Sequence, residues 1–142
     1  MRVNIIGGNG LVGSGISALL SNKHSVRVFG SDDFDMVSRQ FKQNDVFDCD
    51  LFIHAAGVTD ELIVDDYSLS VFKSNSFIKY IVDGLEKTGC SHVVYISTIH
   101  AFGDLAKELS GSSYCSPKSI YGLLHFSTEK MFEILIEKTT IN

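Results

Sequence analysis

A glycine-rich stretch near the start of the chain, IIGGNGLVGSG at 5–15, constrains the fold more than any other feature. It follows a short apolar run and precedes a segment with helical spacing of its apolar residues. Glycines between a strand and a helix let the backbone turn tightly and approach a pyrophosphate, whose charge then faces the first N–H groups of the helix. The stretch therefore predicts a nucleotide-binding turn, although a tight turn without a ligand would give the same pattern.

Two glycine spacings fit this turn. Gly8, Gly10 and Gly13 form G-x-G-x-x-G, while Gly7, Gly10 and Gly13 form G-x-x-G-x-x-G. Both spacings occur in dinucleotide-binding turns, so the motif alone does not choose between them. The residues that we expect to contact a cofactor here are Gly7, Gly10, Leu11, Val12 and Gly13.

The rest of the chain alternates between strand-like and helix-like segments. Short runs rich in Val, Ile, Leu or Phe indicate strands at 2–7, 25–30, 50–57 and 92–98. Helices are predicted at 11–21, near 35–43, at 69–88 with Gly89 at its end, and at 117–138 starting from Pro117, whereas 103–116 is expected to be a loop. The alternation predicts an α/β fold, a Rossmann-like doubly wound parallel sheet with helices on both faces.

The length of 142 residues predicts one domain, residues 1–142, with enough apolar residues (44%) to form a core. Only four strands are predicted, whereas about five or six are usual in an open doubly wound sheet. We therefore expect the N-terminal part of a larger protein, truncated before its last strands, rather than a complete small protein. If the chain is instead a complete small protein, we expect a homodimer that covers the exposed edge of the sheet.

Composition argues against several classes of partner. The net charge is −5, and Lys and Arg do not cluster, so a nucleic-acid partner is not expected. No apolar stretch approaches the length of a membrane span, about 18 residues, and no metal site is predicted. Cys49, Cys90 and Cys115 are widely spaced, which predicts free, internally packed thiols and a cytoplasmic protein.

An acidic segment, FGSDDFD at 29–35, follows the second predicted strand. A carboxylate at this place accepts a hydrogen bond from the 2′-hydroxyl of an adenosine ribose and repels a 2′-phosphate. Asp32 or Asp33 would therefore favour NAD over the alternative NADP. The same side chains would also serve to cap the short helix predicted near 35–43, and the two uses are compatible.

Several motifs together resemble the extended short-chain dehydrogenase/reductases, the NAD-dependent epimerase/dehydratase family that acts on nucleotide sugars. The matching pieces are the glycine turn, HAAG at 54–57, Asn75, YISTIHAFG at 95–103 and PKSIYG at 117–122. They follow the family order over nearly all of the chain. The stretch from the second strand to DLFIHAAG looks most like the dehydrorhamnose-reductase branch.

The resemblance implies a bound NAD or NADP and hydride transfer at a sugar carbon with a tyrosine as acid/base. By position, Tyr121 matches the catalytic tyrosine, Thr98 the catalytic Ser or Thr, and Asn75 the residue that holds a relay water. It also implies cofactor contacts from the HAAG segment, at Ala55, Ala56 and Gly57, and a C-terminal substrate-binding portion that is absent here. Ile99 and His100 replace the acidic pair of the family's 4,6-dehydratases, so that reaction is not expected.

His125 departs from the family pattern. A tyrosine with its ordinary pKa of about 10 is not ionised near neutral pH, and family members lower it with a lysine four residues further along the helix. Here that residue is His125, while Lys118 and Lys130 lie elsewhere and are expected at the surface. Two interpretations follow. Either Tyr121 and His125 serve hydride chemistry and cofactor binding, or the chain is a catalytically degenerate NAD-binding or scaffolding module in which His125 has no catalytic role.

Overall fold

The computed structural model describes residues 1–35, 40–57, 67–103 and 108–142. Its centre is a parallel sheet of four strands in the order β2-β1-β5-β6. The strands are β1 (Arg2–Ile6), β2 (Ser25–Phe29), β5 (Leu51–His54) and β6 (His92–Tyr95). All three neighbouring pairs are parallel, which confirms the predicted α/β, Rossmann-like sheet.

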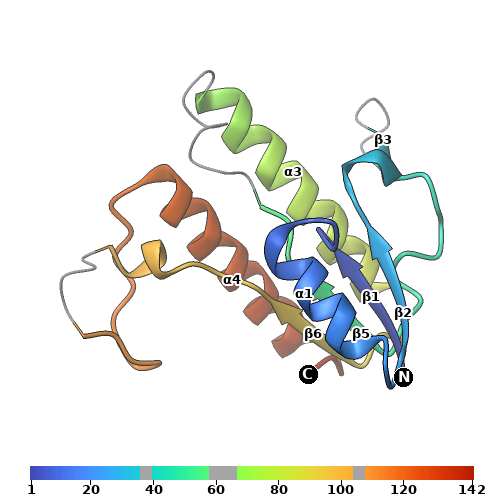
Figure 1. Cartoon of the computed structure of the whole chain (residues 1–142). Coiled ribbons are helices and arrows are strands. Elements are labelled where there is room, and N and C mark those ends of the chain that lie inside the picture. The colour runs from blue at the N-terminus through green and yellow to red at the C-terminus, as the bar shows by residue number, and fades with distance from the viewer. Residues whose placement is uncertain (36–39, 58–66, 104–107) are drawn as a thin grey trace.

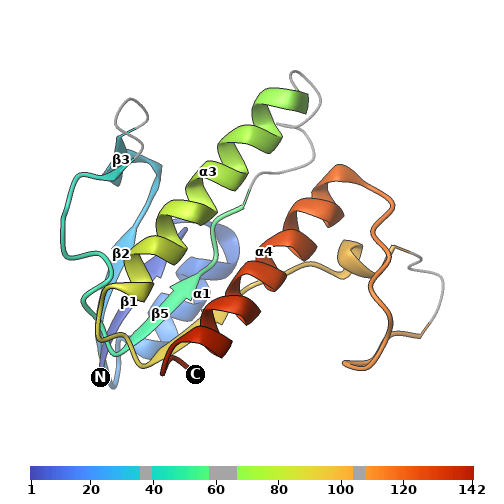
Figure 2. The same ribbon diagram turned by 180° about the vertical axis from the view of Figure 1, so that it is seen from behind.

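Helices cover both faces of this sheet. On one face lies α1 (Leu11–Leu20), and on the other lie α3 (Tyr67–Glu86) and α4 (Ile120–Lys138), as the two opposite views show (Figures 1 and 2). Because α1 connects β1 to β2, and α3 connects β5 to β6, each of these two pairs of parallel strands is joined by a helical crossover. The carboxyl ends of all four strands consequently meet at one edge of the sheet, where ligands bind in such folds.

The last helix starts later than the sequence predicts. We expected it from Pro117, but α4 begins at Ile120, with Ser119 as its N-cap. The Ser119 hydroxyl accepts a hydrogen bond from the Gly122 N–H at 3.0 Å, which satisfies one of the free donors of the first turn. This serine cap determines the start of the helix, and Pro117 lies in the segment before it.

The short helix predicted near 35–43 is wrong for the residues described there, while 36–39 lie outside the described part. Instead, β3 (Phe34–Asp35) and β4 (Gln40–Phe41) form a small antiparallel ladder. The Phe34 and Phe41 rings pack edge to face at 5.2 Å, and both contact Phe77 of α3. Burial of both rings against α3 stabilises the ladder where local sequence suggested a helix.

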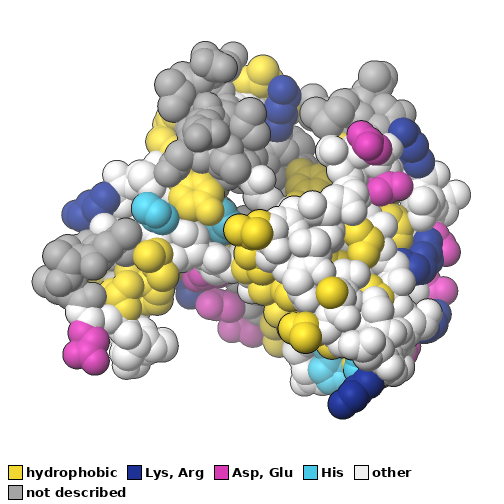
Figure 3. All heavy atoms as spheres, in the orientation of Figure 1, with side chains coloured by type: hydrophobic (Ala, Val, Ile, Leu, Met, Phe, Trp, Pro, Cys, Tyr) yellow, Lys and Arg dark blue, Asp and Glu magenta, His cyan; other side chains and the backbone are white. Residues whose placement is uncertain are grey.

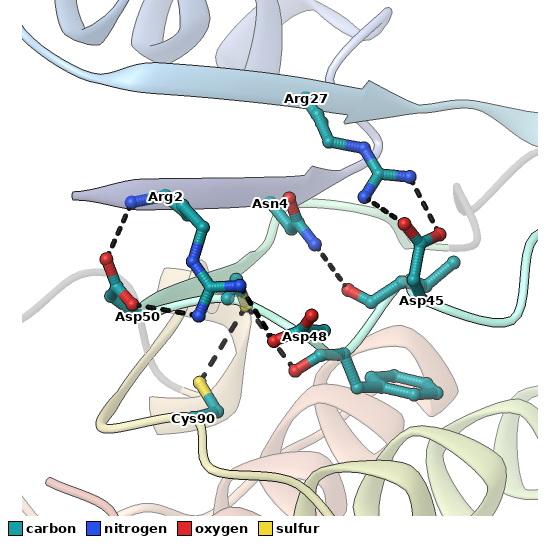
Figure 4. Close-up of polar contacts among 10 residues, drawn as sticks. Arg2, Asn4, Arg27, Asp45, Asp48, Asp50 and Cys90 are labelled. Atoms are coloured by element: carbon teal, nitrogen blue, oxygen red, sulfur yellow. Dashed lines mark hydrogen bonds and ion pairs between the residues drawn. The ribbon is translucent and has the colours of Figure 1, made fainter.

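Side-chain bonds hold the connection from β4 to β5 against the sheet (Figure 4). Arg27 forms an ion pair with Asp45 at 2.7 Å, and the buried Asn4 side chain donates to the Val46 carbonyl at 2.7 Å. Arg2 adds ion pairs to Asp48 and Asp50. These contacts from β1 and β2 fix a segment that lacks a helix in its described residues.

The two faces of the sheet have cores of unequal size. The larger core, under α3 and α4, is rich in aromatic residues, including Phe29, Phe52 and Phe132. It also contains Cys49 and Cys90, whose sulfur atoms lie 3.9 Å apart, while Cys115 is half-buried; all three are free. The smaller core under α1 consists of Val3, Ile5 and Ile53 with partly buried neighbours.

At the β6 edge the last residue of the chain pairs with the sheet. The Asn142 N–H donates to the Ser91 carbonyl at 2.9 Å, and the Asn142 carbonyl accepts from the Val93 N–H at 2.8 Å. This is the pattern of a parallel neighbour opposite His92. Within the described residues, the helices are too short or too polar to cross a lipid bilayer.

Candidate functional site

A cleft of about 460 Å³ opens at the carboxyl ends of the strands, between the β1–α1 turn, α3 and α4. Its apolar wall includes Phe34, Phe41 and Phe77, and Figure 3 shows the molecule hollowed above α1. Residues from the separate sequence motifs meet along its walls, namely Gly7, Gly30, Ala56, Gly57 and His125. The cleft therefore joins the glycine turn to the start of α4.

The glycine turn is built by close approach of backbone segments. Gly7 has a φ of +77°, which favours glycine, and a Cβ at this residue would lie 2.5 Å from the Ala56 nitrogen. A Cβ on Gly13 would lie 2.3 Å from the Gly7 carbonyl oxygen. Gly8 is also confined, by Val28 of β2, so the structure uses the glycines of both predicted spacings.

The N-terminus of α1 is open at this turn. Its first three residues are Leu11, Val12 and Gly13, whose N–H groups have no acceptor in the preceding turn of a helix. The N-cap is Gly10, which supplies no side-chain cap, and this helix has no acidic residue in its first turn. Leu11 is 94% exposed. An anionic group can therefore approach these N–H groups directly.

The acidic segment after β2 forms a 3-10 turn, η1 (Ser31–Asp33). Asp33 accepts a hydrogen bond from the Gly30 N–H at 2.7 Å, so it caps this turn. Asp32 is exposed, and its backbone carbonyl accepts from the Lys42 side chain at 2.5 Å. Sequence reasoning missed Lys42, because the small β3–β4 ladder brings it back to this place.

Next to the His125 end of the cleft, a second 3-10 turn packs on α4. His125 lines the cleft, whereas Thr98 and Tyr121 are not among its lining residues. Thr98 is the N-cap of η2 (Ile99–Phe102), and its hydroxyl oxygen accepts from the His100 N–H at 3.3 Å. The His100 carbonyl approaches Gly122 so closely that a Cβ there would lie 2.3 Å from its oxygen. The Tyr121 ring packs edge to face on the rings of His100 and His125, with centroids 5.5 and 4.6 Å away. Thr98, Tyr121 and His125 thus belong to one packed region.

His125 is a buried member of this region. Its Nδ1 lies 2.6 Å from the Tyr95 hydroxyl, and only 8% of the residue is exposed. Burial, and then the neighbouring His100, lowers the pKa of His125, while burial raises the pKa of Tyr95. The imidazole is therefore held as a neutral, hydrogen-bonded group.

His54, at the end of β5, lies beneath this pair. Its ring centroid is 5.2 Å from that of Tyr95, and the residue is 1% exposed. Burial, followed by the repulsion that a protonated His125 would exert, lowers the pKa of His54 to about 3. The ring is therefore neutral over the ordinary pH range.

The α3 wall of the cleft differs from the expected arrangement. Asn75 is exposed and is absent from the residues that line the cleft, whereas Ser74, one position earlier, lines it together with Lys73. The relay role of Asn75 stays a prediction. The helical spacing of Ser74 with the inward-facing Phe77 and Ile78 was the available signal.

Two buried polar atoms of the cleft residues, Ser74 Oγ and His54 Nδ1, have no hydrogen-bond partner within the described part of the chain. Because unpaired buried polar atoms are costly, they suit a cleft that receives a polar ligand. The open helix N-terminus suits its phosphate groups. A dinucleotide therefore fits the groups present.

Neither neighbouring lysine substitutes for the expected lysine at position 125. Lys118 is exposed, and Lys130 is exposed and forms an ion pair with Glu133 at 2.7 Å. Both are surface residues, as predicted. Sequence reasoning missed Tyr95, although a partly buried tyrosine at the carboxyl end of a strand generally needs a hydrogen-bond partner for its hydroxyl.

Solved structures of about twice the length share this fold. UDP-glucuronic acid 4-epimerase from Bacillus cereus, in complex with UDP-glucuronic acid and NAD, superposes with a TM-score of 0.80 at 19% identity, over 99% of this chain and 54% of that one. UDP-N-acetylglucosamine 4-epimerase from Methanobrevibacter ruminantium gives 0.82 at 16% identity, over 99% and 52%.

A dTDP-4-dehydrorhamnose reductase from Clostridium acetobutylicum gives a TM-score of 0.72 at 24% identity, over 95% of this chain and 50% of that one. The chain thus spans about half the length of these structures. No curated protein matches it. The profile of the NAD dependent epimerase/dehydratase family matches residues 3–142, nearly the whole chain. The resemblance and the NAD cofactor class expected from the motifs are thereby confirmed: the chain belongs to the NAD-dependent epimerase/dehydratase family.

Proposed function

We propose that this chain is the NAD-binding half, residues 1–142, of a nucleotide-sugar epimerase, reductase or dehydrogenase. One observation carries the proposal: a single cleft joins the glycine turn to His125 on α4, and the Tyr121 ring packs against His125. In such enzymes the two ends of a dinucleotide must be held at once. The substrate would be a nucleotide sugar, as in the epimerase structures, and a second half of the protein would complete its site.

The cofactor would be held mainly by backbone at one end of the cleft. The N–H groups of Leu11, Val12 and Gly13 would receive the pyrophosphate at the helix N-terminus. The exposed Asp32 carboxylate would accept from a ribose hydroxyl and favour NAD over NADP. Ala56 and Gly57 line the middle of the cleft and would bound the cofactor there.

The chemistry would be centred on Tyr121. Bound NAD would accept and return a hydride at a sugar carbon. Tyr121 would take up and return the proton of the sugar hydroxyl, as general acid/base. The Thr98 oxygen accepts from the His100 N–H, which leaves its hydroxyl hydrogen to donate to the same sugar oxygen. Asn75 would hold a relay water only if α3 turned its side chain toward the cleft, whereas here the residue is exposed and lies outside the cleft lining.

The alternative is a catalytically degenerate NAD-binding or scaffolding module. The observation in its favour is that His125 is neutral and buried, so it lacks the permanent charge with which a lysine would favour the phenolate of Tyr121. We expect His125→Lys to accelerate hydride transfer in a protein that includes the substrate-binding half. Unchanged turnover with normal cofactor binding would favour the module.

Calorimetric titration of the chain with NAD and with NADP tests the cofactor proposal. We expect NAD to bind about tenfold more tightly than NADP, because a carboxylate repels the 2′-phosphate. Asp32→Ala should reduce this difference, while Asp48→Ala, at an exposed carboxylate outside the cleft, should leave it unchanged. Absence of heat with either dinucleotide would refute the proposal.

A further inference from the structure

His125 bridges the carboxyl ends of two neighbouring strands. On one side its Nδ1 lies 2.6 Å from the hydroxyl of Tyr95, the last residue of β6. On the other side, a Cβ placed on Gly57, just after β5, would lie 3.3 Å from its Nε2 and 3.5 Å from its Cε1. The ring is therefore fixed at Nδ1 by a side chain and meets the exposed Gly57 backbone with its Nε2 edge.

The hydrogen bond at Nδ1 is linked to which ring nitrogen carries the proton, because either Tyr95 or Nδ1 can be its donor. Burial raises the pKa of Tyr95, so its hydroxyl stays protonated and able to donate, and burial lowers the pKa of His125, so its imidazole is neutral and has one N–H. If Tyr95 donates to Nδ1, the imidazole proton must reside on Nε2. The single N–H of the ring then lies beside Gly57, at the wall of the cleft.

We propose that Tyr95 is a positioning residue, which donates to Nδ1 of His125 and thereby aims the Nε2–H of the imidazole at a hydroxyl of the nicotinamide ribose. The inference rests on the proposed function, because it requires a dinucleotide in the cleft. It assigns the ribose contact to a Tyr95–His125 pair that reaches from β6 across to α4. The histidine side chain is shorter than a lysine side chain, and the hydrogen bond from the Tyr95 hydroxyl compensates by orienting the imidazole ring.

The tautomer is measured first, without any ligand. Nitrogen NMR of the imidazoles in the free chain should show His125 protonated on Nε2, with Nδ1 as acceptor. In Tyr95→Phe, which removes one hydroxyl and keeps the ring, we expect this signature to change toward a mixture of tautomers. A chain in which Nδ1 carries the proton, or a signature unchanged in Tyr95→Phe, would overturn the proposal.

Ligand titrations then separate positioning from a purely structural role. NAD contains the nicotinamide ribose, whereas ADP lacks it and retains the adenosine and pyrophosphate. We expect Tyr95→Phe to weaken NAD about fivefold, as the loss of one oriented hydrogen bond does, and to leave ADP affinity unchanged. Equal loss for both ligands, or no loss for either, would contradict the positioning role.

Tyr80→Phe is the matched control. Its hydroxyl accepts from the Phe41 N–H at 3.3 Å, and Tyr80 lies outside the residues that line the cleft. This variant should leave both the His125 signature and the affinity for NAD unchanged. If the unmodified chain binds neither NAD nor ADP, the proposed function fails and the ribose contact with it. If NAD binds normally and Tyr95→Phe binds it equally well, only the positioning role fails.

Discussion

At the β1–α1 turn the cleft is walled by backbone, whereas at the start of α4 it is walled by side chains that contact one another. In the turn, the Ala56 backbone occupies the space that a Cβ on Gly7 would need, and the Gly7 carbonyl occupies the space that a Cβ on Gly13 would need. At α4, the His125 ring packs against the rings of Tyr121 and Tyr95, and one hydrogen bond joins His125 to Tyr95. A backbone site tolerates no added atom, while a side-chain site can be rebuilt from different residues.

This difference explains why the two ends relate differently to the family pattern. The turn retains Gly7 and Gly13 because a Cβ at either would strike neighbouring main chain, while a Cβ on Gly10 would lie 3.2 Å from the Gly7 carbonyl oxygen. The α4 end carries His125 in place of lysine, and Tyr95 provides a partner for it. Three predictions test the contrast, in order of decreasing effect.

The largest effect is expected at Gly7. Gly7→Ala should lower the free energy of unfolding by about 3 kcal/mol, because a Cβ meets both a positive φ and the Ala56 backbone. Gly15→Ala is the matched control, since a Cβ there meets nothing within 4 Å in a helix, and it should stabilise by up to about 1 kcal/mol. Urea unfolding of both variants measures this. Similar effects of the two substitutions on stability would contradict the conclusion that the turn has no space for a Cβ at Gly7.

Lowering the pH should reduce the free energy of unfolding through His54, which lies beneath the Tyr95–His125 pair. Its pKa in the fold, about 3, lies below the ordinary value of 6.5. Between these values the unfolded chain binds a proton that the folded chain does not, so the free energy of unfolding falls as pH falls. For each unit by which the pH falls, the loss is up to about 1.4 kcal/mol, which over a single unit is smaller than the effect of Gly7→Ala.

Urea unfolding at several pH values within that window checks this expectation. His54→Phe keeps an aromatic ring among Phe77, Tyr95 and Phe132 but cannot bind a proton. Its stability should fall less steeply with acid, and the remaining slope should include His125, whose pKa is also lowered. A slope equal to that of the unmodified chain would exclude His54 as the cause.

The smallest effect concerns the turn after β2. Asp33→Ala should cost about 1 kcal/mol of folding stability, because the Gly30 N–H loses its cap. Asp32→Ala should change stability by less than about 0.5 kcal/mol, since this side chain is exposed and only its backbone carbonyl is bonded. Thermal unfolding compares the two. A larger loss for Asp32 would reverse the roles assigned to this pair.

Much of the fold could be predicted from the sequence because its signals are local. Apolar runs and the glycine turn give the four strands and α1, and Gly89 follows the end of α3. The helix expected near 35–43 failed in its described part because the contacts of Phe34 and Phe41 with α3 are distant in sequence. Similarly, helix propensity did not reveal that Ser119, rather than Pro117, defines the start of α4.

The sequence by itself determined the parallel α/β architecture, the glycine turn and the family, because these depend on short motifs and on the periodicity of apolar residues. Only the tertiary structure decided the partners at the cleft. It placed Ser74 rather than Asn75 in the wall, returned Lys42 to Asp32, and joined Tyr95 to His125 across 30 positions of sequence. Such contacts depend on how helices and strands pack side by side, and no local pattern records that packing.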